Sequence, residues 1–225
     1  MIGGALLGAG KYINGLVPSD DIHEQFDLTY SNVLDITVHQ GRLITLRKND
    51  VRVHDGMGPN IAYTITGVNG DDDAGVCVVG GDLVIVRPSG LYRYDGISGD
   101  NPTLLFNPAG STALTFDGQH YIVSMGGTAS EYRFRRYSQA GVYQDGFVSF
   151  GDLNGDYADA HGVSWTGKYY VSYCRGVTRI HDVDLTQIGE FGTRNDPNMW
   201  RYAQNGRRAI RIKRRGSTVQ ILENE

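Results

Sequence analysis

The stretch 33–56, VLDITVHQGRLITLRKNDVRVHDG, constrains the fold of this chain more than any other feature. It contains three short runs with the character of β-strands, separated by polar turns: Val33–His39, Arg42–Arg47 and Asp50–His54. Apolar and polar side chains alternate through the first run, which is the period of a strand with one buried face. The unit therefore predicts a small antiparallel sheet built from consecutive hairpins.

Four further copies of this unit follow, at 76–96, 112–138, 163–182 and 200–223. The glycine of the first turn falls at positions 41, 81, 118, 167 and 206, so the spacings are 40, 37, 49 and 39 residues. The third strand ends at positions 54, 94, 137, 181 and 222, so its spacings are 40, 43, 44 and 41. Two independent marks with one period of this length, and several strands in each unit, are typical of propeller blades.

A fourth strand is expected after the third strand of the first four copies, at Asn60–Thr66, Thr103–Phe106, Phe147–Phe150 and Leu185–Phe191. The fifth copy ends at Glu225 without room for one, whereas residues 21–29, DIHEQFDLT, resemble a fourth strand that lacks the first three. We therefore predict an all-β, five-bladed β-propeller of four-stranded antiparallel blades. The N-terminal strand Ile22–Leu28 closes the ring by lying alongside Ser217–Leu222, which leaves no free sheet edge.

Charge supports this closure. Between Arg201 and Leu222 the sequence has seven basic residues and no acidic one: Arg201, Arg207, Arg208, Arg211, Lys213, Arg214 and Arg215. The incoming strand carries Asp20, Asp21, Glu24 and Asp27, and opposite charges on adjacent strands favour pairing by about 0.2–1 kcal/mol each. A second interpretation of the basic run is a surface for an anionic partner, formed by Arg207, Arg208, Arg211, Lys213, Arg214 and Arg215. Nucleic acid is not the expected partner, because the net charge is −4 and no helix-turn-helix, zinc or base-stacking motif accompanies these residues.

The first residues are atypical of the repeat. We divide the chain into an N-terminal arm, residues 1–19, and a propeller domain, residues 20–225. The apolar part of the arm lacks the positive charge that precedes a secretory signal core, and it is too short to span a bilayer. No membrane association is expected. A glycine-rich apolar arm of this kind predicts a contact with another protein subunit through Ile2, Leu6, Leu7 and Tyr12.

The connection before the fourth copy, Gly151–Gly162, is the longest in the repeat region and is rich in oxygen-bearing side chains. Asp152, Asn154, Asp156 and Asp159 resemble ligands of a calcium loop. Counted from Asp152, however, the twelfth position is Val163, where the EF-hand pattern requires a bidentate glutamate. We therefore expect a polar turn at the propeller rim, with no metal and no other cofactor. The acidic segment Asn69–Asp73 occupies the matching place before the second copy, so both loops are expected on one face, near the entrance to the central channel.

An enzyme is the first class of function to weigh. Arabinanase-type glycosidases are similar in gross architecture, and in them paired carboxylates face the central channel. Asp35, Asp73 and Asp159 form such a set on paper. Blades of about forty residues leave little chain for a substrate cleft, and no nucleophile motif or phosphate-binding glycine loop is present. These points predict that the chain is not an enzyme and has no catalytic residues.

A lectin is the second class. The compact blades resemble those of tachylectin-type five-bladed propellers in repeat length and blade number over residues 20–225. That resemblance implies binding of a surface glycan, for which Tyr92, Tyr169 and Trp200 are the candidate aromatic residues. Packing in the core or between blades is the expected role of these three side chains. The five first turns differ in sequence, so five equal sugar sites are not expected.

A structural or adaptor subunit is the third class and our leading hypothesis. A small propeller with divergent blades and a glycine-rich arm is similar to accessory proteins of bacteriophage virions, in which a disc docks on a tail or capsid component. The resemblance implies location in a virion and other protein subunits as partners.

Overall fold

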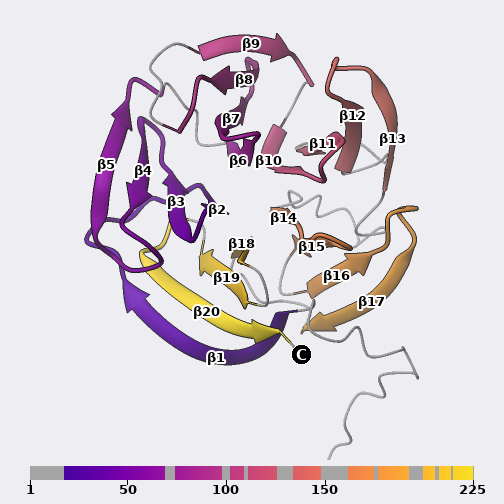
Figure 1. The fold of residues 1–225 in the computed structure, drawn as a ribbon. Helices are drawn as coiled ribbons and strands as arrows, with labels where there is room; N and C mark the ends of the chain where they lie inside the picture. Colours follow the sequence, from indigo (N-terminus) through magenta and orange to yellow (C-terminus); the bar gives the residue numbers. More distant parts are fainter. Residues whose placement is uncertain are drawn as a thin grey trace, which may run out of the picture.

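The computed structural model describes residues 18–68, 74–97, 102–108, 111–125, 134–147, 162–174, 177–192, 200–205, 208–213 and 215–224. The strands form five separate four-stranded antiparallel sheets arranged as blades around one axis (Figure 1). The prediction of an all-β, five-bladed propeller is confirmed. In the described part of the chain, no helix is long and apolar enough to cross a membrane.

Each blade runs from an inner strand beside the axis to an outer strand at the rim. Blade 1 consists of β2 (Asp35–His39), β3 (Arg42–Leu46), β4 (Asp50–His54) and β5 (Ile61–Thr66). Blade 2 consists of β6 (Gly75–Val79), β7 (Asp82–Arg87), β8 (Gly90–Tyr94) and β9 (Pro102–Phe106). Blade 3 consists of β10 (Ser111–Phe116), β11 (His120–Met125), β12 (Phe134–Ser138) and β13 (Tyr143–Phe147). Blade 4 consists of β14 (Gly162–Trp165), β15 (Tyr170–Cys174), β16 (Val177–His181) and β17 (Gln187–Gly192). The closing blade consists of β18 (Trp200–Asn205), β19 (Arg208–Lys213), β20 (Thr218–Asn224) and β1 (Pro18–Asp27), in that order from the axis outward.

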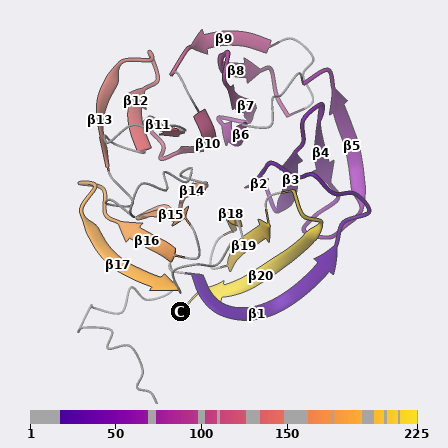
Figure 2. The same ribbon diagram turned by 180° about the vertical axis from the view of Figure 1, so that it is seen from behind.

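The ring is closed by β1, which lies antiparallel to β20 along the rim (Figures 1 and 2). Ile22 pairs with Leu222 and Asp27 pairs with Thr218, as the sequence predicts. The strand begins at Pro18, so Pro18 and Ser19 belong to the closing blade and not to the arm.

The strand order shows that the predicted charge pairing across this seam is wrong. β20 lies between β1 and β19, so the basic residues of β19 are two strands away from the acidic residues of β1. Uncharged side chains of β20 donate hydrogen bonds across the seam instead. The hydroxyl of Thr218 donates to Asp27 at 2.6 Å, and the amide of Gln220 donates to Gln25 at 2.9 Å.

The core lies between the blades, and both faces of a blade are buried. In β7, Leu83 and Ile85 pack toward blade 1, whereas Val84 and Val86 pack toward blade 3. All four side chains are fully buried. The expectation of one buried face is therefore too simple, because each blade is covered on both sides by its neighbours.

One predicted strand was misplaced. The fourth strand of the third copy is Tyr143–Phe147, not Phe147–Phe150. The reason is a tight turn after β12, in which the amide of Gly141 donates to the carbonyl of Ser138 at 2.9 Å. The amide of Val142 also donates to the Ser138 hydroxyl at 3.1 Å, so the chain reverses early.

The first turn of blade 1 has the two-residue form that the sequence indicated, with positive φ at Gln40 (49°) and Gly41 (71°).

Two faces of the disc follow from the antiparallel order. One face carries the connections from the outer strand of one blade to the inner strand of the next, such as 28–34. It also carries the turns between the second and third strands, such as 47–49, and we call it the crossover face. The opposite face carries the first turns, such as 40–41, and the third-to-fourth turns, such as 55–60, and we call it the hairpin face. Pro18 pairs with Asn224 at the hairpin face, so β1 begins at this face.

Two blades approach each other closely at Gly75, which lies at the start of the inner strand β6. A Cβ atom on Gly75 would lie 2.5 Å from the backbone nitrogen of Leu114 and 2.6 Å from the carbonyl carbon of Ala113. Backbone atoms of β10 cannot move aside as a flexible side chain can. The absence of a side chain at Gly75 therefore allows blades 2 and 3 to meet.

We expect Gly75→Ala to lower the free energy of unfolding by about 2 kcal/mol or more, because overpacking forces two strands apart. Gly58→Ala is the matched control, since a Cβ atom there meets nothing within 4 Å. Urea unfolding followed by tryptophan fluorescence measures both variants. Equal unfolding midpoints for the two would contradict the packing argument.

Candidate functional site

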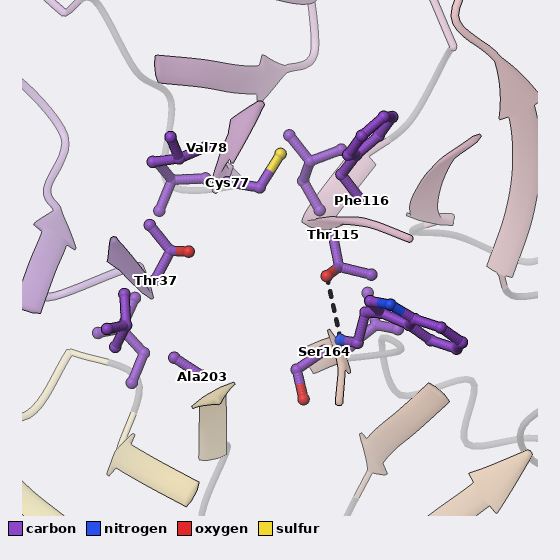
Figure 3. A pocket seen from close by; sticks show the side chains of 13 residues that line it. Thr37, Cys77, Val78, Thr115, Phe116, Ser164 and Ala203 are labelled. Carbon is purple, nitrogen blue, oxygen red and sulfur yellow. Dashed lines mark hydrogen bonds between the residues drawn. The ribbon is translucent and has the colours of Figure 1, made fainter. Parts of the chain in front are cut away.

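The five inner strands surround a cavity on the propeller axis with a volume of about 140 Å³. Figure 3 shows side chains from all five blades around this opening, among them Thr37, Cys77, Thr115, Ser164 and Ala203. Each belongs to the inner strand of its blade, so the repeat itself brings side chains from every blade to the axis. The cavity is the shared product of the five copies.

Hydroxyl groups and one thiol give the axial cavity its chemistry. The amide of Trp165 donates to the Thr115 hydroxyl at 3.2 Å, which links β14 to β10 (Figure 3). Burial raises the pKa of the Cys77 thiol above its usual value, and the nearby Asp35 carboxylate raises it further. Because the thiolate is the reactive form of cysteine, Cys77 is a buried, inert thiol at neutral pH. This wall suits water or a small neutral ligand.

A buried ion pair lies beside the axis toward the crossover face. Arg201 of β18 is fully buried, and its Nε lies 3.9 Å from a carboxylate oxygen of Asp35 in β2, which is 4% exposed. The same Nε donates to the carbonyl of Leu34 at 2.7 Å. The other Asp35 oxygen accepts from the amide of Val76 in β6 at 2.8 Å. These contacts join the closing blade to blades 1 and 2, so the pair holds the ring together at the point where it closes.

Asp35 was one member of the carboxylate set suggested by the sequence. The other two members, Asp73 and Asp159, lie outside the described residues. Among the described residues, Asp35 pairs with Arg201 and not with another carboxylate of the predicted set. Sequence reasoning placed Arg201 in the basic run and missed this pairing, although both residues stand at the start of an inner strand: Asp35 is the first residue of β2 and Arg201 is the second residue of β18.

A second polar cluster connects blades 3 and 4. The Tyr170 hydroxyl donates to Asp117 at 2.5 Å, and Arg136 donates to Asp145 at 2.7 Å and to the carbonyl of Val183 at 3.0 Å. Burial alone would raise the pKa of Asp117, but hydrogen bonds from Tyr170 and from the backbone amides of Gln119 and His120 lower it below its usual value. Burial, followed by the hydrogen bond to Asp117, raises the pKa of Tyr170. The cluster is a clamp between two blades.

Some of the other predicted site residues lie outside the described part of the chain, and others lie on β19. The arm residues Ile2, Leu6, Leu7 and Tyr12 lie outside the described residues, as do Arg207, Arg214 and the cation candidates Asp152, Asn154, Asp156 and Asp159. Arg208 and Lys213 are exposed at opposite ends of β19, and Arg211 between them donates to Gln220 at 2.8 Å. The described part of the basic run therefore extends along a strand from one face of the disc to the other.

Of the three aromatic residues predicted as candidates for glycan binding, two lie beside basic side chains and one begins an inner strand. The guanidinium of Arg87 lies 4.7 Å from the centre of the Tyr92 ring, and the Lys168 ammonium lies 5.1 Å from that of Tyr169. Trp200 is the first residue of β18. Among the described residues, no group of three or more His, Cys, Asp or Glu side chains could hold a metal ion.

Buried histidines occupy the end of the third strand in two blades. His54 stands there in blade 1 and His181 in blade 4, and both are buried. Burial, together with the positive charge of Arg179, lowers the pKa of His181 to about 4. Burial also lowers the pKa of His54. Both histidines are neutral in the folded protein at neutral pH, so they are packing groups there.

No protein-family model matches the chain, and none of the curated proteins matches its sequence. Solved structures do match. The glutaminyl cyclase of Myxococcus xanthus superposes with a TM-score of 0.69 at 12% sequence identity, covering 91% of this chain and 96% of the cyclase. Raptor from Chaetomium thermophilum matches with a TM-score of 0.51 at 8% identity, covering 92% of this chain but 29% of Raptor. At these identities the similarity shows the propeller fold alone.

The cyclase corrects the prediction that this chain is not an enzyme. One ground for that prediction was blade length, because blades of about forty residues were expected to leave too little chain for a substrate cleft. The cyclase has the same architecture over nearly its whole length and is an enzyme. Compact blades are therefore compatible with catalysis, and the size argument was wrong.

Protonation of His181 is expected to make the fold sensitive to acid. The unfolded chain takes up a proton on this side chain near pH 6.5, but the folded protein does so only near pH 4. Stability is therefore complete above pH 6.5 and falls between pH 6.5 and about 4, by up to ~3 kcal/mol for this group.

The variant His181→Leu, which copies Leu222 at the same place in the closing blade, should reduce this pH dependence without removing the part due to His54. Unfolding free energies from urea titrations at a series of pH values measure it. An unchanged slope between pH 6.5 and pH 4 in the variant would contradict the assignment.

Proposed function

We propose that the chain is a docking subunit of a larger protein assembly, such as a tail or capsid accessory of a bacteriophage virion. In this proposal it engages its partner through the hairpin face and through residues 1–17. The supporting observation is a set of exposed apolar side chains at this face. Val142 is 58% exposed and Val183 is 52% exposed, and both belong to third-to-fourth turns on the hairpin face of adjacent blades.

The two turns are linked. Arg136 of blade 3 donates to the carbonyl of Val183 in blade 4, which holds the turn of blade 4 against the body of blade 3. Tyr143, next to Val142, is 45% exposed. Exposed apolar groups held on a rigid frame are typical of protein interaction surfaces. β1 begins at the same face, because Pro18 pairs with Asn224, so in this proposal residues 1–17 and the turns contact one partner.

The docking proposal is tested with two variants of the full chain. Removal of residues 1–17 and the double substitution Val142→Ser with Val183→Ser should each leave the unfolding temperature nearly unchanged, because neither touches the core. Each should lower the amount of partner protein that co-purifies with the tagged chain by about tenfold or more. Leu104→Ser on β9 is the control, since Leu104 is 54% exposed on the outer strand of another blade. Co-purification that equals the wild type in both variants would overturn the proposal.

A second candidate function is favoured by the full-length similarity to the Myxococcus xanthus enzyme: cyclisation of an N-terminal glutamine. In this reaction the α-amine attacks the side-chain amide carbon. A new C–N bond forms, the bond to the amide nitrogen breaks, and ammonia leaves with a proton from the α-amine. Release of ammonia from peptides that begin with glutamine, and none from the same peptides beginning with asparagine, would support this function. No release at neutral pH would count against it.

A further inference from the structure

A second cleft lies on the crossover face, away from the axis. It is formed where the connection 28–34 passes between the second-to-third turn of blade 1 and the corresponding turn of the closing blade. Its volume is about 420 Å³, within the range of small-molecule sites. It is lined by Asn32, Leu34, Arg47, Lys48, Asn49, Asp50 and Arg215. None of these residues lines the axial cavity, so the two sites are separate.

The backbone of this cleft is held in a conformation that L-residues rarely adopt. Asn32 has φ of 63° and Arg215 has φ of 62°. The two segments bind each other: the amide of Asn32 donates to the carbonyl of Arg215 at 3.2 Å, and the amide of Arg215 donates to the carbonyl of Val33 at 2.6 Å. Asparagine tolerates the left-handed region, but arginine there costs about 1 kcal/mol or more. Two such residues at one cleft indicate that its shape is maintained against local strain.

The cleft is positively charged although the whole chain has a net charge of −4. Its lining has three basic side chains and one acidic side chain, which gives a formal charge of +2. The acidic residue, Asp50, is shared between Arg47 at 3.0 Å and Arg52 at 3.3 Å, so its negative charge is more than balanced. The residues that line the cleft therefore carry more positive than negative formal charge.

Arg47 is fixed in place before any ligand binds. Its Nε donates to the carbonyl of Ser31 at 3.1 Å, and its guanidinium lies 5.4 Å from the centre of the Tyr30 ring. Tyr30 is itself held by His54 at 2.6 Å and by Thr45 at 2.7 Å. Since the other nitrogen of His54 faces the carbonyl of Gly58 at 2.8 Å, that nitrogen carries the proton. The Tyr30 hydroxyl then donates to His54 and accepts from Thr45.

We propose that this cleft binds an oxyanion group, a carboxylate, phosphate or sulfate, on a ligand about the size of a monosaccharide. Arg215 and Lys48 supply positive charge from two different blades. Asn32 and Asn49 supply amide groups for hydrogen bonds to the rest of the ligand. Leu34, which is buried, forms an apolar wall. The site depends on ring closure, because it combines a turn of the first blade with a turn of the last.

The test is a binding titration of the full chain with inorganic phosphate, sulfate, glucuronate and, as the neutral control, glucose. Isothermal titration calorimetry or chemical shifts of the Asn32 and Asn49 amides detect binding. Saturable binding of glucuronate but not of phosphate or sulfate assigns an acidic sugar, and the reverse assigns a free or ester-bound phosphate or sulfate. Binding should weaken as salt increases.

Arg215→Gly is the decisive variant, because glycine accepts the left-handed backbone while the charge is lost. It should fold at least as stably as the wild type and bind the anion about tenfold more weakly, and Arg215→Lys should retain most of the affinity. Arg208→Ala, which removes an exposed basic residue from the opposite end of β19, should bind as the wild type does. Absence of saturable binding of every anion at millimolar concentration, or equal affinities in Arg215→Gly and the wild type, would overturn the proposal.

Discussion

The pairing of β1 with β20 is the interaction on which the rest of the structure depends. The closing blade takes three strands from the end of the chain and one from its beginning, so the ring is complete only when residues separated by nearly the whole sequence meet. The contacts that hold this seam are ordinary: a strand ladder, the bond of Thr218 to Asp27, and the bond of Gln220 to Gln25. Arg201 and Asp35 add a buried ion pair between the closing blade and blade 1. Breaking either partner alone would leave an uncompensated charge in the core, which is strongly destabilising.

Closure also explains the composition of the strands. In a ring every blade has a neighbour on each face, so a middle strand such as β7 buries successive side chains on opposite sides. A run of consecutive apolar residues, such as that from Leu83 to Val86, is therefore the pattern of a strand covered twice. The outer strands have one face against solvent, and this is where exposed apolar residues such as Leu104 and Ile188 stand.

Much of the fold could be predicted because it depends on repetition. Two marks with the same period located fifteen strands, and the missing fourth strand of the last copy identified Ile22–Leu28 as its replacement. The predictions that failed concern features that the repeat period does not determine. The turn at Gly141 shifted β13, since a local hydrogen bond to Ser138 decided where the chain reversed. The roles of Arg201 and Asp35 depend on which inner strands become neighbours, and charge counting along the sequence placed Arg201 in a basic run expected to favour pairing with the acidic N-terminal strand. The cleft at Arg215 could have been found by one further step: turns 47–49 and 214–216 occupy the same place in the first and last copies, and closure makes those copies adjacent.

The similarity to the Myxococcus xanthus cyclase shows how little of a propeller's sequence its fold requires. At 12% identity the two chains share a ring over more than nine-tenths of each. The shared part is the pattern of strands and turns, which burial and strand pairing maintain with many different side chains. Function then depends on side chains that the fold does not require, and these lie at the axis, on the two faces and at the seams. In this chain the axial groups are a protonated thiol and hydroxyls, and the ion pair beside them holds blades together. The cleft at Asn32 and Arg215 is one such place, because it lies at the seam between the first and last blades and three basic side chains line it. The left-handed backbone there costs stability, and the hydrogen bonds of Arg215 with Asn32 and Val33 maintain it, so the cleft keeps its shape before any ligand binds.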